Sequence, residues 1–264
     1  MDTPISNKTP TPTLPEGRAY ILKVGGAVVE DPASLAQLIE EFAAIEGPKV
    51  LVHGGGRSAT RIAARLGIES HMADGRRITD QPMLDVVTMV YGGLVNKQLV
   101  AQLQAAGTNA LGLTGADANL IRSHRRPVRD GIDYGCVGDV DHVDSHLLSQ
   151  LIERGITPVI APLTHDGQGY LLHTNADTIA SHVACALAPH FQVTLKFAFE
   201  KRGLLLNPDD PESLVPHITE TDFLRLRTEG IISGGMLPKL ENAFAAIRQG
   251  VSRVLIGETL ITST

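Results

Sequence analysis

Three glycine clusters in this chain stand immediately before predicted helices. They are Gly25–Gly26, Gly54–Gly56 within the stretch KVLVHGGGRS, and Gly234–Gly235. Because glycine has no Cβ, a ligand can come close to the backbone N–H groups there, and the positive end of the following helix attracts an anion. The clusters predict sites for phosphate or carboxylate groups.

Two lysines and one aspartate stand next to such turns. Lys23 lies in the apolar run YILKV, and Lys239 lies near the start of a late helix. Asp177 lies in the first turn of a helix that begins near Asn175. A lysine in an apolar run often extends to solvent, and Asn and Asp are common helix caps, so each has a structural interpretation too. Two cations around one acid nevertheless suit a polyphosphate, where catalysis is mostly positioning and charge neutralisation.

The motifs of several nucleotide-binding classes are absent. The chain has no GxxxxGK[ST], no GxGxxG and no HRD-type loop, which argues against a P-loop protein, a Rossmann dehydrogenase and a protein kinase. A hydroxyl acceptor usually needs a base to take its proton, whereas a carboxylate with a pKa near ~4 is already ionised at neutral pH. The missing base favours phosphoryl transfer to a carboxylate.

Arg76 and Arg77 lie in the polar, turn-rich stretch MADGRRITD. Such a stretch is usually a solvated loop. A guanidinium, however, donates two parallel hydrogen bonds to a carboxylate and is the best partner available for that group. Either arginine is therefore a candidate to hold an acidic substrate.

Composition limits the partners. The chain has 264 residues, 43% of them hydrophobic, and a net charge of -6, so it can bury a sizeable core but has no concentrated positive charge for nucleic acid. Residues 1–17 contain four prolines and no apolar core, so we expect a disordered arm rather than a signal peptide, and no later stretch predicts a membrane span. The only two cysteines, Cys136 and Cys185, form no framework, which fits a cytoplasmic protein.

A metal site held by the protein is not expected. The acidic stretch at residues 131–144 lacks the spacing and closing glutamate of an EF-hand. His142 and His146 stand four residues apart, as zinc ligands do, but without a third ligand motif nearby. We interpret this region as a solvated polar loop.

Strand-like and helix-like segments alternate along the chain, which predicts an α/β fold with a mainly parallel sheet covered on both faces. Gly92 and Gly93 fall inside a long helix expected at residues 81–106, where they cost stability unless something packs closely against them, as in a dimer. The other expected segments are strands at residues 20–24, 110–114, 156–163, 192–198 and 253–256 and helices at 32–45, 58–66 and 144–154.

Several ordered motifs together resemble the acetylglutamate kinases of the amino acid kinase family. They are KVGGA, VHGGGRSA, DGRRITD, NKQLV, VGDV, NADTIASHVA and ISGGMLPKLENA. The resemblance implies a three-layer α/β/α sandwich and a homodimer. It also implies an acylglutamate-binding lobe at residues 18–165 and an ATP-binding lobe at 166–264, with Mg²⁺ carried by the nucleotide. The implied reaction converts the γ-carboxylate of an N-acyl-L-glutamate into an acyl phosphate for arginine biosynthesis.

The resemblance also assigns residues. It implies that Lys23 and Lys239 stabilise the transferring phosphoryl group and that Asp177 holds both lysines. Arg77, with Arg76 as the fallback, matches the arginine that grips the α-carboxylate. The other implied substrate-binding residues are Gly55, Gly56, His173 and Asn175, and the implied nucleotide-binding residues are Gly25, Gly26, Glu200, Gly203, Gly234 and Gly235.

Two positions depart from the family pattern. His173 stands where the family commonly has an asparagine that binds substrate, and Glu200, in KFAFEKRG, stands where an aspartate of a TDVxG-like turn is usual. The acyl group, acetyl or succinyl, stays open. So do two alternatives: a sibling kinase for another carboxylate or carbamate, and a weakened regulatory protein. Because its prolines oppose the extra helix of arginine-inhibited hexamers, the arm at residues 1–17 predicts an arginine-insensitive dimer.

Overall fold

The computed structural model describes residues 17–73, 75–198, 202–207, 210–232 and 236–263. The strands are β1 (Arg18–Val24), β2 (Lys49–His53), β3 (Met72–Ala73), β4 (Arg76–Arg77), β5 (Ala110–Leu113), β6 (Ile121–Arg125), β7 (Gly138–Val143), β8 (Thr157–Ile160), β9 (Leu163–His165), β10 (Leu171–His173), β11 (Gln192–Ala198), β12 (His217–Ile218), β13 (Arg253–Ile256) and β14 (Thr259–Ile261). The helices are α1 (Gly26–Glu30), α2 (Pro32–Ala44), α3 (Gly56–Arg65), α4 (Gln81–Val87), η1 (Thr88–Val95), α5 (Asn96–Ala105), η2 (Asp117–Asn119), α6 (Ser145–Glu153), α7 (Ala176–Leu187), η3 (Pro211–Ser213), α8 (Glu220–Thr228) and α9 (Met236–Arg248). The predicted arm, apart from residue 17, lies outside the described residues, as do Glu200, Gly234 and Gly235.

A central sheet of eight strands runs through the molecule in the order β12-β14-β13-β11-β1-β2-β8-β5. All neighbouring pairs in it are parallel except β13 with β14. The inner strand β2 is buried along its whole length, as is usual for parallel strands covered on both faces. The prediction of a mainly parallel α/β sheet is confirmed.

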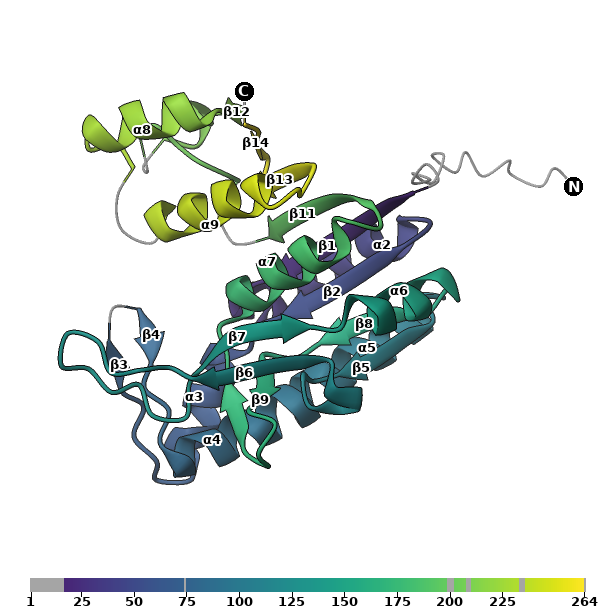
Figure 1. Cartoon of the computed structure of the whole chain (residues 1–264), viewed down its shortest axis with the longest axis vertical. Coiled ribbons are helices and arrows are strands. Elements are labelled where there is room, and N and C mark those ends of the chain that lie inside the picture. The colour runs from purple at the N-terminus through teal and green to yellow at the C-terminus, as the bar shows by residue number, and fades with distance from the viewer. Residues whose placement is uncertain (1–16, 74, 199–201, 208–209, 233–235, 264) are drawn as a thin grey trace, which may run out of the picture.

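Each face of the sheet carries helices (Figure 1). Successive residues of β1 point to opposite faces. Ile21 packs into a core with α6, α7, α8 and α9, whereas Leu22 packs into a second core with α2, α3 and the helical segment at residues 81–105. Lys23 therefore lies on the same face as Ile21, the face that carries α7. The sheet and its two helical layers form the expected α/β/α sandwich.

The carboxyl ends of β1 and β2 meet at one edge of the central sheet, because the two strands are parallel. Figure 1 shows the short hairpin of β3 and β4 projecting beside α3, near one end of β6 and β7. A smaller sheet has the order β10-β9-β6-β7. Its last strand along the chain, β10, is followed directly by α7. Segments from both halves of the chain thus converge here, and in α/β proteins such an edge is where ligands bind. The division into lobes at residue 165 stays a prediction.

The long helix expected at residues 81–106 is interrupted. Its middle, η1 (Thr88–Val95), is a π-helix and lies between α4 and α5. The turns of a π-helix are wider than those of an α-helix. A Cβ on Gly92 would lie 3.3 Å from Cδ1 of Leu163, so the close packing predicted there exists within this chain, while Gly93 has open space. π-turns change the direction in which side chains leave a helix and often occur at functional sites, and η1 carries Tyr91 toward the edge described above.

The solvated loop expected at residues 131–144 is only partly a loop. Residues Gly138–Val143 form β7 and pair antiparallel with β6. The prediction was wrong for this strand because most of its polar residues face outward and are not needed for the core. Polarity alone therefore does not separate a loop from a solvent-facing strand.

Candidate active site

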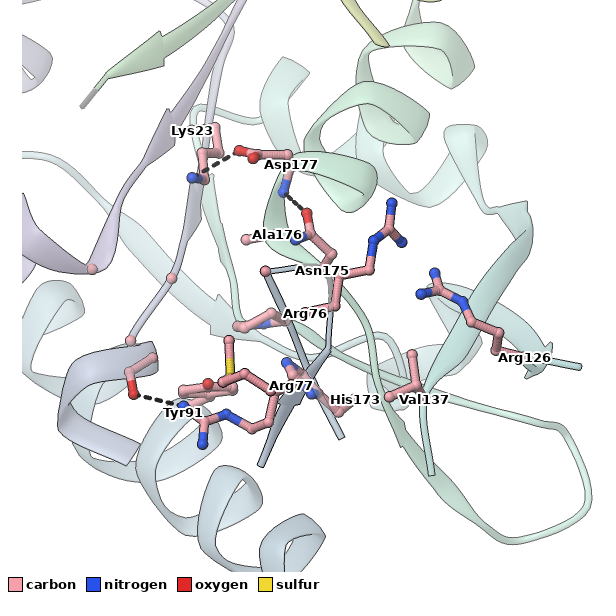
Figure 2. A pocket seen from close by; sticks show the side chains of 17 residues that line it. Lys23, Arg76, Arg77, Tyr91, Arg126, Val137, His173, Asn175, Ala176 and Asp177 are labelled. Atoms are coloured by element: carbon pink, nitrogen blue, oxygen red, sulfur yellow. Dashed lines mark hydrogen bonds and ion pairs between the residues drawn. The ribbon is translucent and has the colours of Figure 1, made fainter. Parts of the chain in front are cut away.

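A cavity of about 200 Å³ opens at this edge of the sheet (Figure 2). It is smaller than the roughly 300–1,000 Å³ of sites that hold drug-sized ligands, so it suits a small molecule. Many of the residues singled out from the sequence line it, namely Lys23, Gly26, Gly55, Gly56, Arg76, Arg77, His173, Asn175 and Asp177. Positions that are far apart in the sequence are thus brought together.

Asp177 holds two lysines, one on each oxygen of its carboxylate. Nζ of Lys23 lies 2.7 Å from Oδ1, and Nζ of Lys239 donates to Oδ2 at 2.9 Å. Burial by itself raises the pKa of Asp177, but the two ammonium groups outweigh it and hold the pKa below its usual range. The Asp177 carboxylate is therefore ionised at neutral pH.

Three separate elements bring this cluster together. Lys23 is the last but one residue of β1, and Lys239 lies in the first turn of α9. Asp177 lies in the first turn of α7, where the side chain of Asn175 caps the helix by accepting from the N–H groups of Asp177 and Thr178 at 2.8 and 3.2 Å. The cap expected from the sequence is therefore present. The cap uses Oδ1 of Asn175 (Figure 2), and Asn175 also lines the cavity.

The two glycine turns touch each other. A Cβ on Gly26 would lie 3.3 Å from the backbone nitrogen of Gly56 and 3.4 Å from that of Gly55, so glycine at residue 26 allows this close approach. Gly55 and Gly56 are the N-cap and first residue of α3, whose first N–H groups have no acceptor inside the helix. Two backbone donors are therefore available to an anion in the cavity beside Gly26.

Arg77, rather than Arg76, is the buried arginine. Its Nη2 donates to the carbonyl of Gly56 at 3.0 Å and to Oγ1 of Thr60 at 2.8 Å, and its Nη1 donates to Oγ of Ser70 at 2.9 Å. These bonds fix the guanidinium against the first turn of α3 while it lines the cavity. Arg76, its neighbour on β4, is exposed.

The side chain of His173 lines the cavity and is neutral. Its Nδ1 lies 2.9 Å from Oγ1 of Thr79, and its ring packs at 5.6 Å against the ring of Tyr91. Burial, with Arg77 and Arg126 nearby, lowers the pKa of His173 to about 4. The ring is therefore uncharged at neutral pH, and it can form hydrogen bonds to a ligand without adding charge.

Two polar side chains of the cavity wall, those of Tyr91 and Arg126, were not singled out from the sequence. Tyr91 falls inside the long helix expected at residues 81–106; it lies in η1 and lines the cavity. Arg126 lies in a basic segment where nothing distinguishes it from its neighbours. It donates to Oδ1 of Asp139 through Nε at 3.0 Å and Nη2 at 2.6 Å, and it lines the cavity opposite Lys23 (Figure 2).

Two glycines expected at the nucleotide lie outside the wall of this cavity. Gly25 donates its N–H to the carbonyl of Ala198 at 3.2 Å and is not part of the cavity wall. Gly203 is buried, and a Cβ there would come within 2.5 Å of Oγ1 of Thr259 and 2.8 Å of Cδ1 of Leu214. Glycine at residue 203 is therefore required by packing, and its contact with a nucleotide stays a prediction.

The described residues contain neither a metal-binding cluster nor a membrane-spanning helix. Across them, no group of three or more His, Cys, Asp or Glu side chains is arranged to hold a metal ion. None of the helices in the same part of the chain combines the length and the apolar character needed to span a bilayer.

The sequence is similar to known kinases. Residues 18–258 match the family model described as "Amino acid kinase family". The acetylglutamate kinase of Bacteroides fragilis (strain ATCC 25285) is 64% identical over 236 residues, which cover 89% of this chain and 90% of that protein. The acetylglutamate kinase of Methanopyrus kandleri is 40% identical over 239 residues, which cover 89% and 93% of the two chains.

A solved structure has the same fold. N-acetylglutamate synthase from Neisseria gonorrhoeae, in complex with coenzyme A and N-acetyl-glutamate, superimposes with a TM-score of 0.80 at 21% identity. The match covers 94% of this chain and 60% of the synthase. At this identity the likeness concerns the fold alone. Together with the family match over nearly the whole chain, it leads to one conclusion: the chain belongs to the amino acid kinase family.

Proposed function

We propose that this chain is an N-acylglutamate kinase of the acetylglutamate kinase type, which transfers a phosphoryl group from ATP to the γ-carboxylate of an N-acyl-L-glutamate in arginine biosynthesis. The observation that carries the proposal is the binding of Lys23 and Lys239 to the two oxygens of Asp177, beside the backbone donors of Gly55 and Gly56. Cations and N–H groups in this arrangement suit a reaction between two anions. The acyl phosphate formed in this way is the activated product.

The lysines are proposed to lower the barrier electrostatically. A phosphoryl group in transfer spreads negative charge over its oxygens, and fixed positive groups stabilise that charge more than they stabilise the separated substrates. Lys23 and Lys239 supply the charge. Asp177 holds both ammonium groups in place, so little reorganisation is needed during the reaction.

The acceptor carboxylate needs orientation rather than deprotonation. A carboxylate with a pKa near ~4 is ionised at neutral pH, so no general base is required. We place the γ-carboxylate at the N–H groups of Gly55 and Gly56, at the positive end of α3. The α-carboxylate then lies at the guanidinium of Arg77, and the amide of Asn175 and the ring of His173 contact the amino acid part of the substrate.

The nucleotide is ATP, because the reaction is a kinase reaction, and we propose that Mg²⁺ arrives with its phosphates. ATP supplies the phosphoryl group that is transferred. Gly26 lies at the meeting point of the two glycine turns, where the transferring group would pass. Contacts of the nucleotide with Gly25, Gly203, Glu200, Gly234 and Gly235 remain part of the proposal.

A trapping assay tests the proposed function. The protein is incubated with ATP, Mg²⁺, N-acetyl-L-glutamate and hydroxylamine, which converts an acyl phosphate into a coloured hydroxamate. We expect hydroxamate that depends on every component. A panel of other carboxylates and carbamate in the same assay separates a sibling kinase, and the absence of product with any acceptor would favour a regulatory protein.

The residues at one corner of the cavity favour an acyl group other than acetyl. With the carboxylates placed as above, we place the acyl group beside Arg76, Arg126 and Val137, which line the same cavity. A neighbouring cavity of about 490 Å³ shares both arginines. Asp139 neutralises only one of these two cations. An acyl group that ends in a carboxylate, such as succinyl, therefore fits this corner better than the methyl of an acetyl group does.

Kinetics with both substrates test that choice. We expect kcat/KM for N-succinyl-L-glutamate to exceed that for N-acetyl-L-glutamate, and we expect Arg76→Gln to reduce this ratio about tenfold, as the loss of one charge-assisted contact does. If the ratio is the same in the wild-type protein and in Arg76→Gln, Arg76 does not discriminate between the two acyl groups. Activity with either substrate leaves the kinase proposal intact.

We also propose a homodimer. Met89 and Leu94 of η1 are exposed apolar side chains on the outer side of the helical segment at residues 81–105, and a second copy of this chain would cover them. Light scattering is expected to give a dimeric mass, and Met89→Lys is expected to give a monomer. A hexameric mass would refute the proposal.

A further inference from the structure

The imidazole of His53 occupies a sealed position immediately before the central glycine turn. His53 is the last residue of β2, and its side chain is 0% exposed. It points to the same face of the sheet as Leu51, the face that carries α5. A buried histidine can simply fill space, so the hydrogen bonds of its ring decide whether it does more.

Chemistry fixes the direction of these bonds. Nδ1 of His53 lies 2.8 Å from the carbonyl oxygen of Gly54, an atom that only accepts, so Nδ1 carries the proton. Burial lowers the pKa of His53 to about 4, so the ring is neutral at neutral pH and its Nε2 is an acceptor. Asn96 supplies the donor, with Nδ2 at 3.2 Å. A single tautomer satisfies both contacts.

Asn96 is itself held in one orientation. Its Nδ2 also donates to the carbonyl of Val159 at 2.9 Å, and its Oδ1 accepts from Nζ of Lys97 at 3.1 Å. An amide turned by half a revolution would place its oxygen against the carbonyl of Val159 and lose both contacts. The hydrogen-bond chain therefore runs in one direction, from Lys97 through Asn96 and His53 to the carbonyl of Gly54.

That carbonyl belongs to the same peptide unit as the N–H of Gly55. A trans peptide is rigid and planar, so its oxygen and its N–H point in opposite directions. With the oxygen of Gly54 held on the side of His53, the N–H of Gly55 points away from the buried chain. We infer that His53 is a positioning residue, which orients the Gly55 N–H toward the acceptor carboxylate; this inference rests on the proposed function.

The turn needs such a contact because glycine peptides rotate easily. Tyr91 packs against Gly55, since a Cβ there would lie 2.9 Å from Cδ1 of the ring. A ring carbon limits space but gives no strong directional bond. The Nδ1–H of His53 is therefore the polar contact that selects one orientation of the peptide. Loss of one preorganised oxyanion-hole donor costs about 10²–10³ in kcat.

Two substitutions separate positioning from packing. His53→Asn keeps an amide N–H near the position of Nδ1 but leaves a cavity, whereas His53→Leu fills the space and has no donor. We expect His53→Leu to lower kcat about 10² while the KM for ATP is unchanged. His53→Asn should keep at least about ten times more of the wild-type kcat than His53→Leu, although it is no more stable. Equal kcat losses, or losses that follow the melting temperature, would overturn the inference.

A direct measurement covers the case in which neither variant folds. Nitrogen NMR of the wild-type protein labelled in its histidine rings reports which nitrogen carries the proton. The inference predicts a neutral His53 protonated at Nδ1, and protonation at Nε2 contradicts it. Wild-type activity in the hydroxamate assay is scored separately, so failure of the proposed kinase function and failure of the His53 inference give different results.

Discussion

Nζ of Lys23 lies 2.7 Å from Oδ1 of Asp177, so an ion pair joins the end of β1 to the first turn of α7. The pair crosses from the centre of the parallel sheet to the helical layer that covers one of its faces. Both side chains are largely buried, at 11% and 18% exposure, so solvent screens their charges only weakly. A charge at this point acts on the cavity rather than on the surface.

Lys239→Ala should nearly abolish turnover without unfolding the protein. The substitution removes a cation that acts mainly when charge builds up in the transition state, so we expect kcat to fall by about two to three powers of ten. The measurement is steady-state kinetics, with circular dichroism to check the fold. The control is Lys196→Ala, on β11, the strand that pairs with β1. This variant should keep near-normal kcat. Loss of less than about tenfold in Lys239→Ala would show that its role is misassigned.

Arg77→Lys should affect binding more than turnover. Lysine keeps the positive charge but not the planar fork that donates two parallel bonds. We expect the KM for the acylglutamate to rise about 10- to 100-fold, with a smaller change in kcat. Arg76→Gln, assayed with N-acetyl-L-glutamate, is the control for this segment. The same KM shift in both variants would mean that Arg77 has no special contact with the α-carboxylate.

Gly55→Ala should damage both the fold around the turn and the activity. A Cβ at this position would lie 2.9 Å from Cδ1 and 3.0 Å from Cε1 of Tyr91, which is closer than carbon atoms approach. The ring or the turn must shift, and the Gly55 N–H shifts with it. Gly93→Ala, where nothing lies within 4 Å, is the matched control and should be neutral or slightly stabilising. Equal thermal unfolding curves for the two variants would contradict this.

Lowering the pH should destabilise the protein over a pH range that is set by the pKa values of His53 in the unfolded and folded states. Its ordinary pKa of 6.5 falls to about 4 on folding because the side chain is buried, so between these values the unfolded chain binds a proton that the folded protein does not. The free energy of unfolding therefore decreases as the pH falls through this window, by at most about 3 kcal/mol for His53. His173 acts in the same direction but is partly exposed to the cavity.

Urea unfolding over this pH range checks the effect. The wild-type protein should lose stability steadily from about pH 6.5 toward about pH 4. His53→Leu should show a shallower decrease, since it removes one of the groups that take up a proton on unfolding. Parallel curves for the two proteins would mean that His53 is charged or exposed in the folded state.

Sequence patterns were sufficient for the elements whose residues are buried or cap a helix. The strand predicted at residues 192–198 coincides with β11, and the cap near Asn175 begins α7 as expected. These features depend on local periodicity and on short-range hydrogen bonds. The alternation of strands with helices also led to the correct sheet, because parallel strands need crossovers that cover both faces.

The remaining features depend on contacts between distant segments. Residues 88–95, which form η1, pack against Gly55 and Leu163, and helical periodicity does not predict such contacts. Arg126 becomes part of the cavity only because β6 folds beside Asp139 of β7. The link between His53 and Asn96 spans 43 residues, and no local pattern connects the two side chains.

The most direct test of the central claim follows the oxygen atoms of the acceptor. The protein is given ATP, Mg²⁺ and N-acetyl-L-glutamate whose γ-carboxylate carries heavy oxygen, and hydroxylamine then cleaves the product at the acyl carbon. If the γ-carboxylate attacks phosphorus, the released phosphate contains one heavy oxygen, which phosphorus NMR detects. Phosphate without heavy oxygen, or hydrolysis of ATP that does not depend on the acylglutamate, would contradict phosphoryl transfer to the carboxylate.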